Sequence, residues 1–276
     1  PSYGAQLIER LIQPRLFGGI LIALTAIQSL WYAPYGLGGS DEGALLATAG
    51  RILRGDVFYE SIDAYPFPGS HYLLAFAMSL FGEHLAVARF LAGLIYGGIV
   101  VILYATALEL LDRSRAALFG IALLGCKFLA WPAYTSSFYW DLSFLAACVA
   151  VFLLLRSSDR SARGPMIGVG AAVGIAFISK QSLGIYLGLA IALLLVLEWF
   201  LNRAGPRENH SLLRPMGYLG LGFSLAAAPM ILYFAAKGLF PQMIYSGLIR
   251  PFTDYAESSG ISFGKPLRWW EFGSLQ

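Results

Sequence analysis

The chain is poor in charge. Only 13% of its 276 residues are Asp, Glu, Lys or Arg, whereas 58% are hydrophobic. A soluble domain carries roughly 25% charged residues, because it has to cover its surface with them. The shortage excludes a cytosolic enzyme and a disordered chain, and it indicates a protein that crosses a membrane several times.

Cysteine and clustered basic residues are scarce as well. The two cysteines, Cys126 and Cys148, each lie inside an apolar run and form no CxxC pair, so no zinc site or disulfide framework is expected. The net charge of +3 is small, and no basic run is interleaved with aromatic residues. Nucleic acid is therefore not an expected partner.

Long apolar runs make up most of the remainder. A helix needs roughly 20 mostly apolar residues to cross a bilayer, and six or seven segments qualify, at about 14–33, 86–110, 116–134, 139–155, 165–179, 183–201 and 213–236. The segment 34–85 is too polar to span. It is predicted to form one helix that begins at Ser40 and stops near Gly55, and a second over 70–81 that is short enough to lie in the interface. The prediction is an all-α, polytopic helical membrane protein with two interfacial helices in its first outer loop.

Positive charge falls in alternate loops. With seven spans, this pattern puts the amino terminus in the cytoplasm and the segments 34–85 and 237–276 outside. Glycines in two of the spans are expected to allow close helix packing. The arginines in these alternate loops are Arg10, Arg15, Arg113, Arg115, Arg156, Arg160, Arg163, Arg203, Arg207 and Arg214, and the glycines are Gly168, Gly170, Gly174, Gly217, Gly220 and Gly222.

Four charged residues are predicted at helix ends on the outer side: Asp41, Asp141, Lys180 and Arg250. Each has a structural interpretation when it is taken alone, as a helix start, an N-cap, a snorkelling lysine or a loop charge. A cluster of charges at membrane depth nevertheless indicates a functional site. A carboxylate can take a proton from an acceptor hydroxyl, while Lys and Arg can bind a phosphate leaving group.

Several short motifs follow one another in a fixed order: Asp41-Glu42-Gly43, Gly55-Asp56, Tyr65-Pro66-Phe67-Pro68, Leu80-Phe81-Gly82 and Arg89-Phe90-Leu91. In this order they resemble the amino-terminal half of the GT-C superfamily of membrane glycosyltransferases, in the branch of the protein O-mannosyltransferases and the aminoarabinose (lipid A) transferases. Asp141, the tripeptide Ser179-Lys180-Gln181 and Arg250 match later landmarks of that branch.

The resemblance implies an inverting glycosyltransferase in a membrane such as the bacterial inner membrane. It would move a sugar from a polyprenyl-phosphate donor to a lipid, glycan or protein acceptor at the outer face. Asp41 would be the general base, Asp141 the second acidic residue of the site, and Lys180 and Arg250 the ligands of the donor phosphate. Residues 1–276 would be a GT-C-like transmembrane catalytic module, incomplete at its carboxyl end. Further residues expected to line the site are Glu42, Tyr65, His71 and Arg89.

Some features leave alternatives open. Many relatives carry Lys where this chain has Tyr65, and some carry an aromatic residue where it has Leu45. A transporter, a structural subunit of a membrane complex or an inactive relative therefore remain alternatives to the enzyme. No cofactor is required by the sequence; a divalent metal is left open, with Asp41, Glu42 and Asp141 as its ligands.

Overall fold

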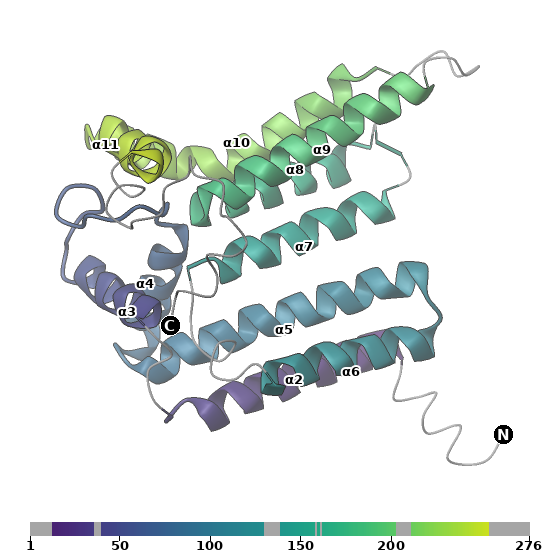
Figure 1. The fold of residues 1–276 in the computed structure, drawn as a ribbon, viewed down its shortest axis with the longest axis horizontal. Coiled ribbons are helices and arrows are strands. Elements are labelled where there is room, and N and C mark those ends of the chain that lie inside the picture. Colours follow the sequence, from purple (N-terminus) through teal and green to yellow (C-terminus); the bar gives the residue numbers. More distant parts are fainter. Residues whose placement is uncertain are drawn as a thin grey trace, which may run out of the picture.

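Seven long helices run side by side with alternating direction (Figure 1) in the computed structural model, which describes residues 13–35, 40–129, 139–157, 159–160, 162–202 and 211–253. They agree with the seven predicted apolar segments to within a few residues, although residues 130–134 of the third segment lie outside the described part. The protein is an all-α, polytopic membrane protein. The helices are α2 (Pro14–Tyr32), α5 (Leu85–Leu110), α6 (Arg113–Leu129), α7 (Asp141–Arg156), α8 (Arg163–Ser179), α9 (Gln181–Asn202) and α10 (Leu213–Ala236).

Two short helices lie between α2 and α5, as predicted. The first, α3 (Ser40–Leu53), has Asp41 and Glu42 in its first turn, where carboxylates suit the helix dipole. The second, α4 (Gly69–Phe81), has 13 residues. Each is followed by a glycine with positive φ, 97° at Gly55 and 91° at Gly82. Glycine adopts this conformation without steric cost, so the chain can turn sharply at both places.

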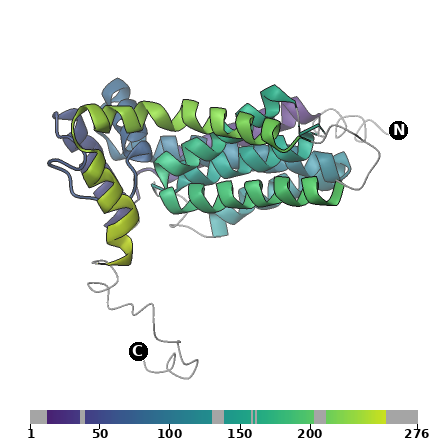
Figure 2. The same cartoon turned by 90° about the horizontal axis from the view of Figure 1, so that it is seen from above.

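The chain turns again after α10. The N–H of Gly238 donates to the carbonyl of Ala235 at 3.0 Å and the N–H of Leu239 to that of Phe234 at 2.8 Å, which is a Schellman motif. A short helix α11 (Phe240–Ile244), a π-helical turn η1 (Tyr245–Ile249) and a 3₁₀ turn η2 (Arg250–Phe252) follow. Figure 2 shows α11 running across the end of the bundle, close to the segment that joins α3 and α4.

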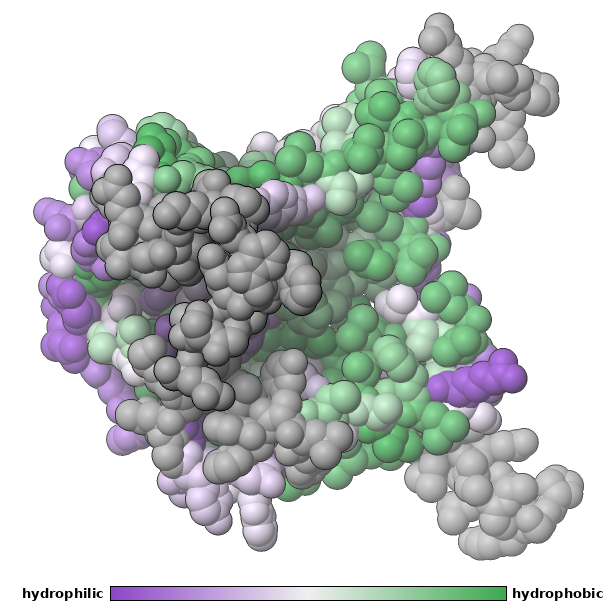
Figure 3. Space-filling view, viewed as in Figure 1, coloured by the Kyte–Doolittle hydropathy of each residue, from purple (hydrophilic) through white to green (hydrophobic). Residues whose placement is uncertain are grey.

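Four of the helices are long and apolar enough to cross a membrane, namely α2, α5, α10 and residues 181–201 of α9. The other three, α6, α7 and α8, have 17, 16 and 17 residues, at the short end of what hydrocarbon requires. Large apolar side chains face outward, such as Leu193 of α9 and Leu225 of α10. Figure 3 shows this apolar surface along the bundle and hydrophilic residues gathered at the end that carries α3 and α4.

The two ends of the bundle are built differently. The described parts of 34–85 and 237–276 lie together at one end (Figure 1). The start of α6, with Arg113 and Arg115, and the connection that carries Arg160 lie at the other. At that second end Arg160 donates to both carboxylate oxygens of Glu198 at 3.0 Å. This is the arrangement that the alternating charge pattern requires, while the side of the membrane that each end faces stays a prediction.

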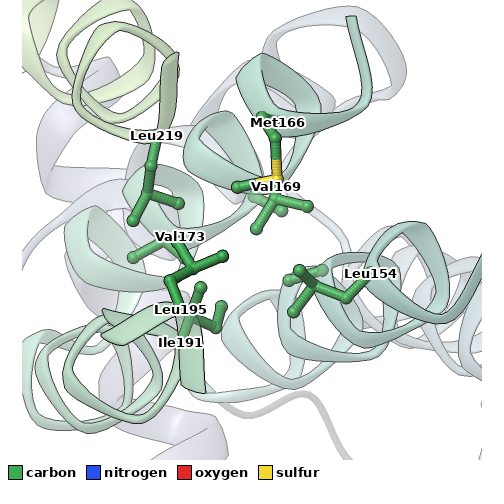
Figure 4. Close-up of a cluster of buried hydrophobic side chains, with 9 residues drawn as sticks. Leu154, Met166, Val169, Val173, Ile191, Leu195 and Leu219 are labelled. Atoms are coloured by element: carbon green, nitrogen blue, oxygen red, sulfur yellow. The ribbon is translucent and has the colours of Figure 1, made fainter. Parts of the chain in front are cut away.

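Helices α8 and α10 pack backbone to backbone. A Cβ placed on Gly170 would lie 2.0 Å from the carbonyl oxygen of Leu219, and one on Gly222 would lie 2.0 Å from that of Ile167. The predicted close packing is thus confirmed at these positions, whereas Gly217 and Gly220 face open space. Beside this contact, α7, α8, α9 and α10 enclose an apolar core (Figure 4), which includes Leu154, Met166, Val169, Val173, Ile191, Leu195 and Leu219.

Candidate active site

A buried ion pair joins three helices at the end where α3 and α4 lie. Arg89 of α5 donates to both carboxylate oxygens of Glu42 on α3, at 3.0 and 2.9 Å, and both side chains are at most 2% exposed. The same guanidinium donates to the carbonyls of Tyr32, Ala33 and Tyr35 at 3.2, 3.0 and 2.6 Å. These carbonyls lie at and just after the carboxyl end of α2, where a cation complements the helix dipole. The pair therefore fixes the exit of α2 and the start of α3.

Asp41 precedes Glu42 in the sequence and meets the opposite environment. It is exposed, and it forms no hydrogen bond or ion pair with the residues that the structure describes. It lies one helical turn before Leu45, on the same face of α3. Leu45 belongs to a buried cluster of α3, α4 and α5 against which Tyr139 also packs. A water-exposed carboxylate thus stands at the rim of this cluster.

Lys180 lies in the turn between α8 and α9, with its ammonium group over two aromatic rings. Its Nζ is 5.5 Å from the ring centre of Tyr139 and 5.0 Å from that of Trp140. Ser70 of α4 donates to the carbonyl of Tyr139 at 2.6 Å and holds this dipeptide in place. Attraction by the aromatic faces orients the cation, and none of the described carboxylates forms an ion pair with it.

Asp141 begins α7 directly after Trp140, in the first turn of the helix. Two residues further on, Ser143 donates to the carbonyl of Ala176 on α8 at 3.0 Å. Because Ala176 precedes Lys180 by about one turn, this bond keeps the start of α7 beside the end of α8. The structure therefore brings the termini that carry Asp141 and Lys180 together, as predicted.

Arg250 is held by Asp63 and by the ring of Tyr65. Its guanidinium carbon lies 4.6 Å from the ring centre of Tyr65, and it forms an ion pair with the carboxylate of Asp63. Asp63 is 71% exposed in its side chain, so water screens much of this pair. The predicted site residues Tyr65 and Arg250 are therefore in direct contact.

His71 of α4 is buried rather than presented to solvent, with 5% of its surface exposed. Its ring lies 5.1 Å from that of Phe58, and its Nδ1 has no hydrogen-bond partner among the described residues. Burial lowers the pKa of His71 to about 4. The imidazole is thus neutral at physiological pH and cannot add a positive charge to the site.

The described residues contain no group of three His, Cys, Asp or Glu side chains that could hold a metal ion. Of the three carboxylates named for such a role, Glu42 already gives both oxygens to Arg89. An open groove of about 490 Å³ lies nearby, between residues 59–63 and residues 241–246. Asp63 both lines this groove and contacts Arg250.

Sequence reasoning does not single out Asp63, Tyr139 or Trp140 as site residues. The aromatic dipeptide directly before Asp141 is a local signal that could have drawn attention to its role. Asp63 carries no such signal, because its contact with Arg250 joins residues 187 positions apart. Gln181, which sequence reasoning names only as part of a landmark tripeptide, also belongs here: its side chain donates to the carbonyl of Tyr65 and to that of Gly247, three residues before Arg250.

These features define a helical membrane protein whose charged and aromatic residues converge at one end of the bundle. A family model described as "Dolichyl-phosphate-mannose-protein mannosyltransferase" matches residues 65–234, which is more than half of the chain. The chain belongs to this family. The predicted resemblance to the protein O-mannosyltransferase branch of the GT-C superfamily is thereby confirmed.

One solved structure supports the fold. It is that of the S. cerevisiae protein O-mannosyltransferase Pmt1-Pmt2 complex bound to the sugar donor, with a TM-score of 0.60 and 17% sequence identity. The match covers 83% of this chain but 34% of the yeast chain, so the sequence spans about a third of the length of that protein. No curated protein sequence matches the chain.

Proposed function

We propose that the chain is the amino-terminal part of an inverting glycosyltransferase that moves a sugar from a polyprenyl-phosphate donor to an acceptor hydroxyl. The observation that carries this proposal is that a carboxylate and two cations lie at the same end of an apolar helical bundle. An exposed carboxylate, Asp41, shares that end with two cations, Lys180 and Arg250, that lie over aromatic rings. The family of the chain supports the same reaction.

Lys180 and Arg250 would bind the phosphate of the donor. Lys180 forms no ion pair among the described residues, and the carboxylate of Asp63, which pairs with Arg250, is largely exposed. Releasing or sharing an exposed partner costs little free energy, whereas a charge-assisted hydrogen bond to phosphate is strong. The polyprenyl chain would remain against the apolar helix surfaces that face the lipid.

Asp41 would act as the general base. The acceptor oxygen forms a bond to C1 of the sugar as the bond from C1 to the phosphate oxygen breaks. The hydroxyl proton passes to the Asp41 carboxylate, and the bonding electrons leave with polyprenyl phosphate. Attack opposite the leaving group inverts C1. Lys180 and Arg250 would stabilise the charge that grows on the phosphate, and Asp141 would orient the acceptor.

Replacement of Asp41 by Asn tests this assignment. The variant keeps the size of the side chain but cannot accept the proton, so turnover of a polyprenyl-phosphate sugar should fall by roughly 10² to 10⁴-fold. The measurement is release of polyprenyl phosphate by the full-length protein in liposomes, with a panel of labelled donors and membrane acceptors.

Asp112→Asn is the matched control. Asp112 is also an exposed carboxylate before a helix, but it lies at the other end of the bundle and pairs with Arg115. Its replacement should leave turnover unchanged. Equal turnover by wild type and Asp41→Asn would remove Asp41 from the role of base. Failure of the wild type with every donor would favour an inactive relative.

The proposal also places the amino terminus in the cytoplasm and the site on the outer face. Single cysteines at Ser61 and Arg115, both exposed and at opposite ends, test the orientation in a background that lacks Cys126 and Cys148. A membrane-impermeant maleimide added outside intact cells should label the cysteine at 61 and spare the one at 115. The reverse pattern would overturn the orientation.

A further inference from the structure

The side chain of Gln181 uses both ends of its carboxamide to join three separate segments. Its Nε2 donates to the carbonyl of Tyr65 at 3.0 Å and to that of Gly247 at 2.7 Å. Its Oε1 accepts from the N–H of Phe67 at 3.1 Å. The start of α9 is thereby tied to residues 65–67 and to η1.

Each of these bonds lies next to a candidate phosphate ligand. Lys180 directly precedes Gln181 in the chain. Tyr65 supplies the ring under the guanidinium of Arg250, and Gly247 comes three residues before Arg250. The backbone that presents each cation is therefore attached, through a single side chain, to the backbone that presents the other.

The segments that Gln181 joins are closely packed where Gly247 meets Phe67. A Cβ placed on Gly247 would lie 2.2 Å from Cε1 of Phe67, a residue that is 1% exposed. Phe67 in turn packs edge-on against Phe177 of α8, with ring centres 5.0 Å apart. Residues 65–67 and 247 are thus pressed together on α8, and the amide of Gln181 sets their register.

We propose that Gln181 is a positioning residue that fixes the separation of Lys180 and Arg250, and so the affinity of the site for the phosphate of the lipid-linked donor. This inference rests on the proposed function. Gln181 does not contact the phosphate itself; it acts through the two cations. The neutral amide suits this task because it adds no charge that would compete with the phosphate.

Gln181→Ala removes all three bonds and should raise the donor KM about tenfold or more, with a smaller change in kcat, because the cations bind the phosphate in both the ground state and the transition state. Gln181→Glu can still accept from the N–H of Phe67 but cannot donate to the two carbonyls. Its donor KM should therefore be at least as high as that of Gln181→Ala. Gly247→Ala, which displaces Phe67, should also raise the donor KM.

Gln28→Leu is the matched control. Gln28 is a glutamine of α2 that is 4% exposed, and neither of its amide atoms has a hydrogen-bond partner among the described residues. Its replacement by Leu should leave the donor KM unchanged and should not lower the thermal midpoint, because it removes an unpaired buried amide. A rise in KM for Gln28→Leu equal to that for Gln181→Ala would overturn the assignment, because the effect would then follow from the loss of any buried amide.

A double-mutant cycle with Arg250→Ala separates positioning from general loss of structure. If Gln181 acts by placing Arg250, Gln181→Ala should add little to the donor KM once Arg250 is absent. If the two increases multiply, the inference is wrong. Arg250→Ala and the double variant are compared at matched protein concentration, after size-exclusion chromatography has removed aggregated protein.

Direct binding of polyprenyl phosphate, followed by tryptophan fluorescence in nanodiscs, distinguishes this inference from the proposed function. Wild type should bind, and Gln181→Ala should bind about tenfold more weakly. Binding by both with the same affinity would overturn only the role of Gln181. A wild type that neither binds the lipid nor turns over a donor would overturn the proposed function and this inference with it.

Discussion

Two clamps hold the same end of the bundle together, and they use opposite chemistry. On one side, the buried charges of Glu42 and Arg89 join α2, α3 and α5. On the other side, the neutral amide of Gln181 joins α9, residues 65–67 and η1. The charged clamp neutralises itself and leaves no cation free. The neutral clamp adds no charge beside Lys180 and Arg250, as the proposed phosphate site requires.

The largest expected effect comes from breaking the charged clamp on one side only. Arg89→Ala removes the ion-pair partner of the buried Glu42 carboxylate, and such a change costs about 3–5 kcal/mol. Glu42→Ala leaves Arg89 its carbonyl partners and should cost less. Thermal unfolding in detergent, followed by circular dichroism, measures both. A loss of stability in Arg89→Ala of less than about 1 kcal/mol, as expected for an exposed ion pair, would show that water reaches Glu42.

Protonation of His71, near the neutral clamp, should cause the next largest loss of stability. His71 packs against Phe58 on that side, and burial lowers its pKa from 6.5 to about 4. Between these two pH values the unfolded chain binds a proton that the folded chain excludes, so stability is lost as the pH falls. The loss at full effect is roughly 3 kcal/mol.

His71→Phe keeps a ring beside Phe58 and removes this titration. The difference in thermal midpoint between wild type and the variant should therefore move in favour of the variant as the pH falls from 7 to 4.5. Carboxylates elsewhere titrate in both proteins and cancel in the comparison. A difference that does not depend on pH would contradict the buried, neutral state of His71.

Removal of the aromatic support of Lys180 should have a moderate effect. Trp140→Leu keeps an apolar side chain but removes the ring 5.0 Å from the ammonium group. A cation–π contact of this kind contributes about 0.5–2 kcal/mol, so the donor KM should rise by roughly two- to thirtyfold. Trp140→Phe should keep part of the donor affinity that Trp140→Leu loses. A donor KM for Trp140→Leu equal to that of the wild type would exclude a contribution from the aromatic contact.

The smallest effect is expected at an exposed pair of the same residue types as the charged clamp. Arg54 and Glu83 lie 3.1 Å apart, with side chains 63% and 48% exposed. Arg54→Ala should cost at most about 1 kcal/mol. The difference between the stability losses of Arg89→Ala and Arg54→Ala gives the contribution of burial, since both pairs consist of an arginine and a glutamate.

Much of the fold can be read from the sequence, because apolar runs of sufficient length have to become helices in a membrane. The two short helices follow from Ser40 and from the glycines at 55 and 82, whose local geometry stops a helix wherever it lies. The convergence of Asp141, Lys180 and Arg250 at one end also follows, because alternating spans put every second connection on the same side.

The partners of individual side chains could not be predicted in the same way. Asp41 and Glu42 are adjacent in the sequence, yet one is exposed and the other is fully buried against Arg89. Which of the two turns inward depends on the rotation of α3 against α5, a quantity that no local pattern of residues encodes.

The sequence by itself determined where the long apolar helices lie along the chain, their alternating direction and the end of the bundle at which the charges gather. The reason is that hydrophobic length and backbone hydrogen bonding act locally along the chain. Only the tertiary structure decided that Glu42 is neutralised, that Lys180 and Arg250 rest on aromatic rings, and that Gln181 links their segments. Those contacts join residues up to 187 positions apart, so they arise from packing between helices rather than within them.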